Sequence, residues 1–241
     1  MTEWAMKRFW QAASTRDTGQ GFAIELDGRS VKTPAKRPLV VPTLDLAQAI
    51  AHEWEAQEEK VDPLTMPFTR AANAALDKVT QQQAEVASLI ADYGASDLLC
   101  YRAGQPADLV RRQAHAWDPI LDWAQDTLGV RMILAEGVMH VDQPDDSIHR
   151  LRAAVAGQGP FSLTALHDLV SLSGSLLIGL AAQRGAFDIS VLWAASIVDE
   201  SFQMDQWGPD ADALTLQQNK AEAFANAAFL QSLLHTKEYT A

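Results

Sequence analysis

The spacing of apolar residues changes along the chain, and the N-terminal part has the alternation that is typical of strands. Residues 22–26 place Phe, Ile and Leu at every second position, so one face of this segment is apolar. Asp27-Gly28 follows, a dipeptide favoured in hairpin turns because such a turn needs positive φ. Val31 continues the return strand, and Leu39-Val40-Val41 predicts another short strand.

After these strands the apolar positions take the spacing of a helix. Thr43 is suited to be an N-cap, and Leu46, Ile50 and Trp54 fall on one helical face. Residues 61–68 contain two prolines and predict a loop. Residues 1–68 are therefore predicted to form a β-rich N-terminal domain with one helix.

Residues 69–241 have helical periodicity and predict a helical domain. A periodic segment runs over 108–128 and stops at Gly129, and Pro119 inside it is expected to kink or restart the helix. Residues around Gly137 allow a small hairpin. Further helices are expected at about 71–76, 84–93, 146–156, 161–183, 188–206 and 210–234. The predicted fold class is α+β, a small β-rich N-terminal unit followed by a larger all-helical C-terminal unit.

The charge of the chain excludes some classes of partner. It has 19 basic and 31 acidic side chains, a formal net charge of −12. Such a charge repels phosphate backbones, so we expect no nucleic-acid binding. It also opposes self-association, so we expect a monomer. Cys100 is the only cysteine, which excludes an internal disulfide and a zinc site made of cysteines.

Neither a membrane span nor a targeting segment is expected. Residues 1–10 contain Glu3 and no apolar run, unlike a signal peptide or an organellar presequence. The longest apolar stretch, 176–182, is interrupted by Gly179 and is too short to cross a bilayer. These features favour a cytoplasmic protein.

The catalytic and cofactor-binding motifs that we sought are incomplete. Gly174 and Gly179 have the spacing of glycines in a phosphate-binding loop, but Leu180 stands where a lysine is required. No two histidines have the spacing of a metalloprotease helix. We therefore expect no cofactor, no bound metal and no enzyme activity.

One alternative function involves the loop around residues 140–149. His140 and His149 flank Asp142, Asp145 and Asp146, residue types that bind metal ions. The alternative is a metal-assisted hydrolase that uses this Asp/His loop. A solvated acidic loop is the simpler interpretation.

A local basic cluster stands out in this acidic chain. Arg29, Lys32, Lys36 and Arg37 lie close together in the sequence, around the predicted return strand. They are consistent with an edge strand protected by charge. They are also consistent with half of an electrostatic docking surface, for an acidic partner.

The predicted helix near 188–207 contains a carboxylate in an apolar line. Trp193, Ile197, Glu200, Met204 and Trp207 fall within a stripe of about 80° on a helical wheel. Burying an unpaired carboxylate is costly. Either a cation inside the protein satisfies Glu200, or the stripe is partly exposed and Glu200 meets a partner. The sequence leaves both open.

Short motifs in a fixed order over about residues 8–230 resemble a family of ATP synthase assembly chaperones, which hold the free alpha subunit of the catalytic head. Each motif alone is weak, but the ordered set is specific. The motifs are Arg8-Phe9-Trp10, Leu26-Asp27-Gly28-Arg29, Thr33-Pro34, Glu53-Trp54, Gln57, Met66-Pro67, Thr69, Asp77, Asp97-Leu98, Tyr101-Arg102, Trp117-Asp118-Pro119, Asp199-Glu200, Gln203, Trp207-Gly208 and Asp210.

The resemblance implies a β-rich N-terminal unit, a helical C-terminal unit, no catalysis and no cofactor. It implies a partner, the unassembled alpha subunit, whose beta-facing apolar surface the protein covers until beta replaces it. It also implies an essential acidic residue near the Trp-Gly motif, which corresponds to Glu200. Organellar members carry a presequence, so this chain resembles a bacterial cytoplasmic member. The candidates for client binding are Glu200, Trp207, Gln203, Asp199, Asp210, Arg29 and Lys32.

Overall fold

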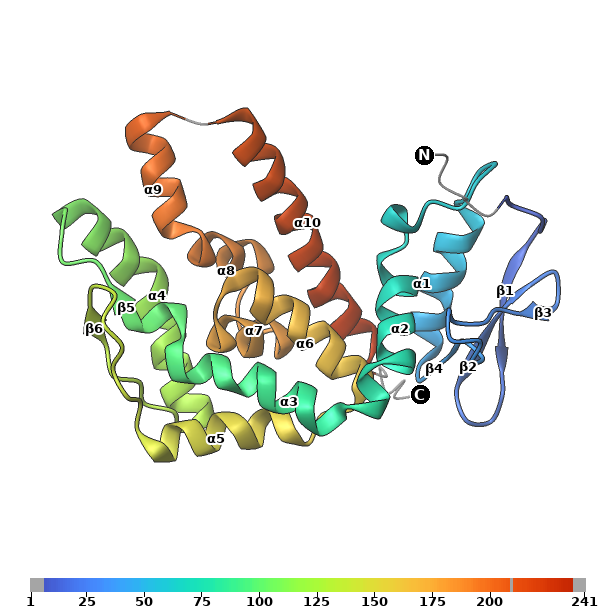
Figure 1. Ribbon diagram of the computed structural model, residues 1–241, viewed down its shortest axis with the longest axis horizontal. Helices are drawn as coiled ribbons and strands as arrows, with labels where there is room; N and C mark the ends of the chain where they lie inside the picture. The colour runs from blue at the N-terminus through green and yellow to red at the C-terminus, as the bar shows by residue number, and fades with distance from the viewer. Residues whose placement is uncertain (1–6, 209, 236–241) are drawn as a thin grey trace, which may run out of the picture. The chain divides into compact units, whose positions relative to one another are not determined.

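The computed structural model describes residues 7–208 and 210–235, which divide into two compact units. Residues 1–83, 160–165 and 229–241 make up the N-terminal unit, and residues 84–159 and 166–228 make up the helical unit (Figure 1). The predicted α+β class is confirmed. The predicted domain boundary between residues 68 and 69 stays a prediction.

The N-terminal unit contains a small antiparallel sheet. Its strands are β1 (Ala13–Asp17), β2 (Phe22–Leu26), β3 (Arg29–Ser30) and β4 (Val40–Val41), with β2 paired to the other three. Asp27 and Gly28 connect β2 to β3 with φ of 48° and 76°. Two consecutive positive φ values are what a tight hairpin requires, so the predicted turn is confirmed.

The helices of this unit are α1 (Leu44–Glu55) and α2 (Pro67–Asp77). Thr43 caps α1, as predicted, because its Oγ1 accepts from Leu46 N at 3.3 Å. Leu46 and Ile50 are fully buried against the sheet residues. Two distant segments complete the same core, through Ala165 and Leu230.

The helical unit contains most of the remaining helices. They are α3 (Gln83–Asp92), α4 (Ala107–Leu128), α5 (Asp145–Ala156), α6 (Pro160–Ser173), α7 (Leu176–Gln183), α8 (Ile189–Ser196), α9 (Val198–Trp207) and α10 (Ala211–Leu233). By sequence, α6 begins in the N-terminal unit and α10 ends in it. Helix α4 ends at Gly129, whose φ is 66°, and continues through Pro119 rather than restarting there.

Two predicted long helices are each divided, which corrects the sequence analysis. The predicted helix 161–183 ends at Gly174, where φ is 71°, and restarts with Ser175 as N-cap of α7. The predicted helix 188–206 is interrupted at Ile197, whose φ of −120° and ψ of 23° are not helical. Gly174-Ser175 is a helix stop followed by a helix start, a signal that the periodicity alone concealed.

The small hairpin predicted around Gly137 is also wrong. Residues Ala135–Glu136 form β6, which pairs in parallel with β5 (Tyr101–Arg102). The partner strand lies before α4, so this pairing is long-range and local turn chemistry cannot predict it. The helical unit therefore contains one short parallel strand pair among its helices.

Candidate functional site

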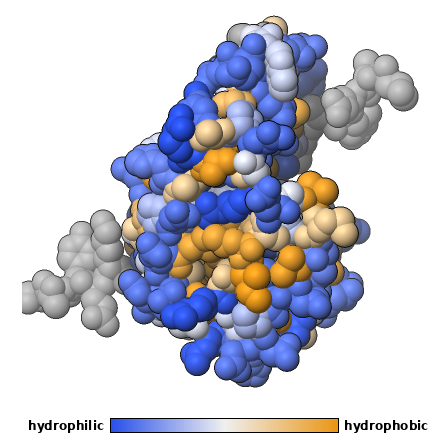
Figure 2. All heavy atoms as spheres, turned by 90° about the vertical axis from the view of Figure 1, so that its left-hand side faces the viewer, coloured by the Kyte–Doolittle hydropathy of each residue, from blue (hydrophilic) through white to orange (hydrophobic). Residues whose placement is uncertain are grey.

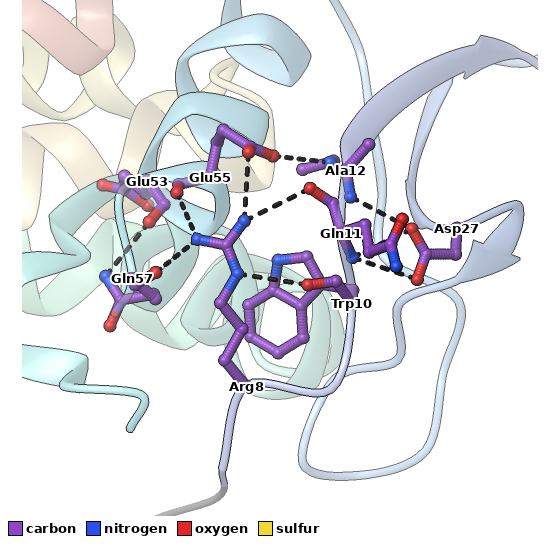
Figure 3. Close-up of polar contacts among 9 residues, drawn as sticks. Arg8, Trp10, Gln11, Ala12, Asp27, Glu53, Glu55 and Gln57 are labelled. Carbon is purple, nitrogen blue, oxygen red and sulfur yellow. Dashed lines mark hydrogen bonds and ion pairs between the residues drawn. The ribbon is translucent and has the colours of Figure 1, made fainter. Parts of the chain in front are cut away.

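Some of the motif residues that carry the family resemblance make hydrogen bonds within the fold itself, and Arg8 is one of them. Its Nη1 donates to the carbonyl oxygens of Glu55 at 2.7 Å and Gln57 at 2.5 Å, and its Nε to that of Trp10 at 3.1 Å (Figure 3). Its Nη2 pairs with Glu55 Oε1 at 3.0 Å. The backbone N–H of Ala13 and, to a smaller extent, the guanidinium of Arg8 donate to the Glu55 carboxylate and hold its pKa below its usual value.

Two further motif residues, Asp27 and Glu53, accept hydrogen bonds from the backbone. Asp27 Oδ1 accepts from Ala12 N at 3.0 Å and from Gln11 N at 3.1 Å (Figure 3). Glu53 Oε1 accepts from Phe68 N at 2.6 Å, and its Oε2 accepts from both N and Oγ1 of Thr69. Burial raises the pKa of Glu53, and these donors oppose the shift. Glu53 thus fixes the first turn of α2.

In the helical unit the fully buried Asp97 also accepts hydrogen bonds from the start of a helix. Its Oδ1 accepts from Ser175 Oγ at 2.7 Å and Leu99 N at 3.1 Å, and its Oδ2 accepts from Leu177 N at 3.0 Å. Asp97 therefore serves as the acceptor for donors at the start of α7. Burial raises the pKa of Asp97, and it raises that of the adjacent Cys100 thiol to about 12. Cys100 stays protonated at neutral pH and is not a nucleophile.

Asp199, one of the predicted binding residues, also makes its side-chain hydrogen bond within the fold. Gln113 Nε2 donates to Asp199 Oδ1 at 2.7 Å, and Gln113 Oε1 accepts from Ala103 N at 2.8 Å. Gln113 is buried in α4, so this bridge fastens the first turn of α9 to α4. Asp199 therefore positions α9.

A second attachment holds α9 on α4. Arg112 Nη1 pairs with Asp205 Oδ2 at 2.5 Å, and the guanidinium lies 5.2 Å from the centroid of the Phe202 ring. Val198 and Phe202 are the buried residues of α9. Of the two possibilities left open for the stripe through Glu200 and Met204, the structure therefore has the exposed one, since the buried residues of α9 lie on its other face.

The opposite face of α9 carries three predicted binding residues whose side chains make no polar contact within the described part of the fold. Glu200 and Gln203 are exposed, and Trp207 is 79% exposed. Within residues 7–208 and 210–235, none of these three side chains has a hydrogen bond or an ion pair. Asp210, by contrast, uses Oδ1 to accept from Asp212 N at 3.0 Å at the start of α10.

The first half of α10 adds to this open surface and was not predicted. None of the residues Ala211–Ala223 is buried, Leu216 is 56% exposed, and the first fully buried side chain is Phe224. Helices in proteins are stabilised mainly by packing of an apolar face, which these turns lack. The signal in the sequence is the weak apolar periodicity of 211–223.

The basic cluster lies in the N-terminal unit. Arg29 and Lys32 are exposed, and neither has an ion pair in the described part of the chain. Arg37 instead donates to the carbonyl oxygen of Leu76 at 2.7 Å. Arg29 and Lys32 are therefore available to a partner, and Arg37 is not.

The Asp/His loop does not assemble a metal site. His140 Nε2 lies 3.3 Å from Asp142 Oδ1, and both line an open depression together with Asp145. No group of three or more potential ligands forms among the residues that the structure describes. Among those residues, too, no helix is long and apolar enough to cross a membrane.

This chain is similar to several known proteins. Residues 7–125 match the family model described as ATP12 chaperone protein. A crystal structure of Atp12 from Paracoccus denitrificans is 44% identical, covers 97% of this chain and 100% of its own, and has a TM-score of 0.93. The Agrobacterium tumefaciens protein Atu1473 is 41% identical over 95% of this chain and 86% of its own, with a TM-score of 0.92. The mitochondrial protein atp12 of Schizosaccharomyces pombe is 24% identical over 87% of this chain and 76% of its own.

Proposed function

Because this chain belongs to the ATP12 chaperone family, which serves the assembly of ATP synthase, we propose that it binds the unassembled alpha subunit. In this proposal the protein covers the apolar surface that alpha later presents to the beta subunit. Apolar patches of that kind aggregate when they are bare. Beta would displace the chaperone by taking the same surface.

One observation carries the choice of binding surface. Among the motif residues of α9, Asp199 is used inside the fold, whereas Glu200, Gln203 and Trp207 are exposed and unpaired in the described structure. The fold itself gives no reason for these three residue types. A partner that contacts α9 and the first half of α10 does.

The residue types suit such a partner. An exposed tryptophan buries a large area when it is covered, and tryptophans are frequent among the residues that dominate binding energy. Glu200 would pair with a basic group or backbone donors of the alpha subunit once water is excluded. The Asp199–Gln113 bridge holds α9 in place, so little ordering of the backbone is required on binding.

The family consists of chaperones and not of enzymes, so the hydrolase alternative is not retained. The absence of a cofactor, the absence of nucleic-acid binding, the cytoplasmic location and the monomeric state stay predictions.

The test replaces Glu200 with lysine and measures both folding and client protection. Glu200→Lys removes one partner of a desolvated pair and adds repulsion, so affinity for alpha falls by about 30-fold or more, which is at least about 2 kcal/mol. Glu85→Lys is the matched control, because Glu85 is also exposed in the first turn of a helix of the same unit. Both substitutions carry the same small helix-dipole cost of about 0.3–1 kcal/mol.

Suppression of alpha-subunit aggregation and the melting temperature are measured on the same samples. We expect Glu200→Lys to melt like Glu85→Lys but to protect alpha poorly. If Glu200→Lys protects alpha at the wild-type stoichiometry, the role of α9 is refuted. If the wild-type protein itself does not bind alpha, the proposed client is wrong.

The exposed pair Arg29 and Lys32 supports a second contact with the same client. If the basic hairpin meets an acidic part of alpha, Arg29→Glu and Lys32→Glu lower the association rate, and salt lowers it in the wild-type protein as well. Both side chains are free of ion pairs in the described structure, so we expect the melting temperature to be unchanged. Association rates at two salt concentrations test this contact.

A further inference from the structure

The segment 130–143, between α4 and α5, exposes large apolar side chains to solvent. Ile133 and Leu134 are about half exposed, and Val138 and Met139 are 93% and 76% exposed. Figure 2 shows a continuous hydrophobic area on the side of the helical unit that carries β6. Exposed apolar patches on soluble proteins mark interaction sites more often than isolated apolar residues do.

This exposure does not come from a loosely held backbone. Gln143, which is nearly buried, accepts from Ile133 N at 2.8 Å and donates to Ile133 O at 3.0 Å. Buried Ser147 makes the equivalent pair of bonds with Arg131 N and O. Gly137 N donates to Arg102 O at 2.8 Å. The backbone at Ile133 is thus held directly, and Val138 and Met139 follow immediately after the anchored Gly137.

The rim of this area is acidic. Glu136, Asp142, Asp145 and Asp146 are exposed, and within the described residues none of them pairs with a lysine or arginine. Arg131 is the exposed base of the segment. The helical unit as a whole has 19 acidic and 8 basic residues, a net charge of −11, whereas the N-terminal unit has 12 and 11, a net charge of −1. Complementarity therefore requires a basic partner.

A depression beside Leu134 fits a basic side chain. It has a volume of ≈ 250 Å³, with Leu121, Met132 and Leu134 among its apolar lining residues. Asp118, Asp122 and Arg131 are its charged lining residues; Asp118 pairs with Arg102 at 2.8 Å, whereas Asp122 is exposed and unpaired in the described structure and so is the carboxylate available to a ligand. Lysine and arginine bury an aliphatic stem on apolar surface and keep the charge at the rim. This depression offers both environments.

The backbone next to the depression offers an unpaired strand edge. Strand β6 pairs with β5 on one side, in a sheet of two strands among the residues described. An extended peptide can add to such an edge through main-chain hydrogen bonds, with side chains at alternate positions giving the specificity.

We propose that the 130–143 segment binds an extended apolar polypeptide segment flanked by lysine or arginine residues. This site goes beyond the proposed function, which places the alpha subunit on α9 and α10. It would give the protein a second hold on an unfolded or unassembled chain, one that recognises composition rather than a single folded surface.

A labelled peptide of sequence Lys-Lys-Val-Leu-Val-Leu-Ser-Lys-Lys tests the site on the full chain by fluorescence anisotropy. We expect saturable binding with a Kd in the range of tens of micromolar, about 6 kcal/mol. The double variant Val138→Asp, Met139→Asp weakens it at least about tenfold. Leu64→Asp is the control, because Leu64 is 80% exposed in the N-terminal unit and its replacement leaves binding unchanged.

Two further measurements make the result specific. A peptide with glutamates in place of lysines binds at least about tenfold more weakly, because the acidic rim repels it. A photoreactive leucine in the lysine peptide crosslinks to residues 130–143 of the wild-type chain, a readout that does not depend on the folding of any variant.

Several results overturn the proposal. They are no saturable binding below about 1 mM, equal binding of the two peptides, unchanged binding by the double variant, and crosslinks elsewhere. Glu200→Lys separates this site from the proposed function. That variant leaves peptide binding unchanged if the site lies at 130–143, and a loss of peptide binding would assign the peptide to α9 and refute the proposal.

Discussion

The network around Arg8 and the outer face of α9 contain similar kinds of residues in opposite situations. Arg8 donates to four carbonyl oxygens and a carboxylate, and its partners are satisfied in return. Glu200 and Trp207, from the same set of motifs, have no side-chain partner in the described residues. The contacts of Arg8 within the fold explain why an arginine is present at this position. No such contact explains Glu200 or Trp207, so these two residues need another explanation.

This difference follows the role of each residue and not the unit in which it lies. Asp97 and Asp199 are in the helical unit, yet Asp97 supports a helix start as Glu53 does in the N-terminal unit, and Asp199 joins α9 to α4 through Gln113. Arg29 is in the N-terminal unit, yet it is exposed and unpaired in the described structure, like Glu200. Substitutions of the two kinds should therefore separate cleanly into effects on stability and effects on binding.

The largest effect on stability is expected for Asp97→Ala. The substitution leaves the donors of Ser175, Leu177 and Leu99 without their buried acceptor, which costs about 2–5 kcal/mol. The melting temperature falls by about 5–15 °C, as measured by calorimetry. Asp92→Ala, which removes only an exposed pair with Arg152, is the control and changes stability by less than about 1 kcal/mol. Equal losses in both variants would contradict the assigned role of Asp97.

A smaller loss is expected for Arg8→Met. The methionine keeps the apolar stem over Trp10 but leaves the carbonyl oxygens of Glu55 and Gln57 without a donor, at a cost of about 1–3 kcal/mol. Urea unfolding measures this loss. Arg16→Met is the control, because Arg16 is about half exposed and makes a single ion pair, with Glu25. If the two arginines prove equivalent, the network around Arg8 does not stabilise the fold.

A third prediction concerns pH and sharpens the same comparison. The pKa of Glu55 in the folded protein is lower than its ordinary value of 4.5. Its contribution to stability is therefore complete above that value and is lost as the pH falls through the lower, folded value. Glu55→Gln removes this contribution, so the stability of the variant depends less on pH below about 4.5. Urea midpoints recorded across the acid range, with Glu58→Gln as control, test it.

The smallest effect on stability is expected for Trp207→Ala. Because Trp207 is 79% exposed, its removal changes the free energy of unfolding by less than about 0.5 kcal/mol. Binding of the alpha subunit nevertheless weakens by about 2 kcal/mol, roughly 30-fold. Calorimetry and a binding titration on one preparation measure both values. A marked fall in the melting temperature would remove the contrast between α9 and the Arg8 network.

The local signals in the sequence predicted the elements that local chemistry determines. Asp27-Gly28 specified its turn, Thr43 specified the start of α1, and Gly129 specified the end of α4. In each case a single residue or dipeptide accounts for the feature, because it adopts the required positive φ or accepts a hydrogen bond from a free N–H at the start of a helix. The apolar face of Leu46, Ile50 and Trp54 was equally predictable because helical periodicity alone defines it.

The remaining features depend on residues distant in the sequence. Nothing near Ser175 reveals that Asp97 supplies the acceptor for the start of α7, and nothing near Ala135 reveals its pairing with Tyr101. For the candidate site, the helical wheel selected Glu200 but could not decide between burial and exposure, and the structure was needed to show that Glu200 is exposed. The weak apolar periodicity of 211–223 was a signal for the exposure of the first half of α10, although it was not used to predict that exposure.

The N-terminal core closes on residues that the ribosome makes about 190 positions after its strands and α1. Leu230 lies in the same cluster as Trp10 and Ile24, and the Thr43 hydroxyl donates to Leu233 O at 2.6 Å. During translation the strands and α1 emerge long before α10 exists to cover them. Vectorial synthesis therefore exposes this apolar surface until α10 has emerged, and a nascent chain stalled before α10 would itself be a substrate for general chaperones.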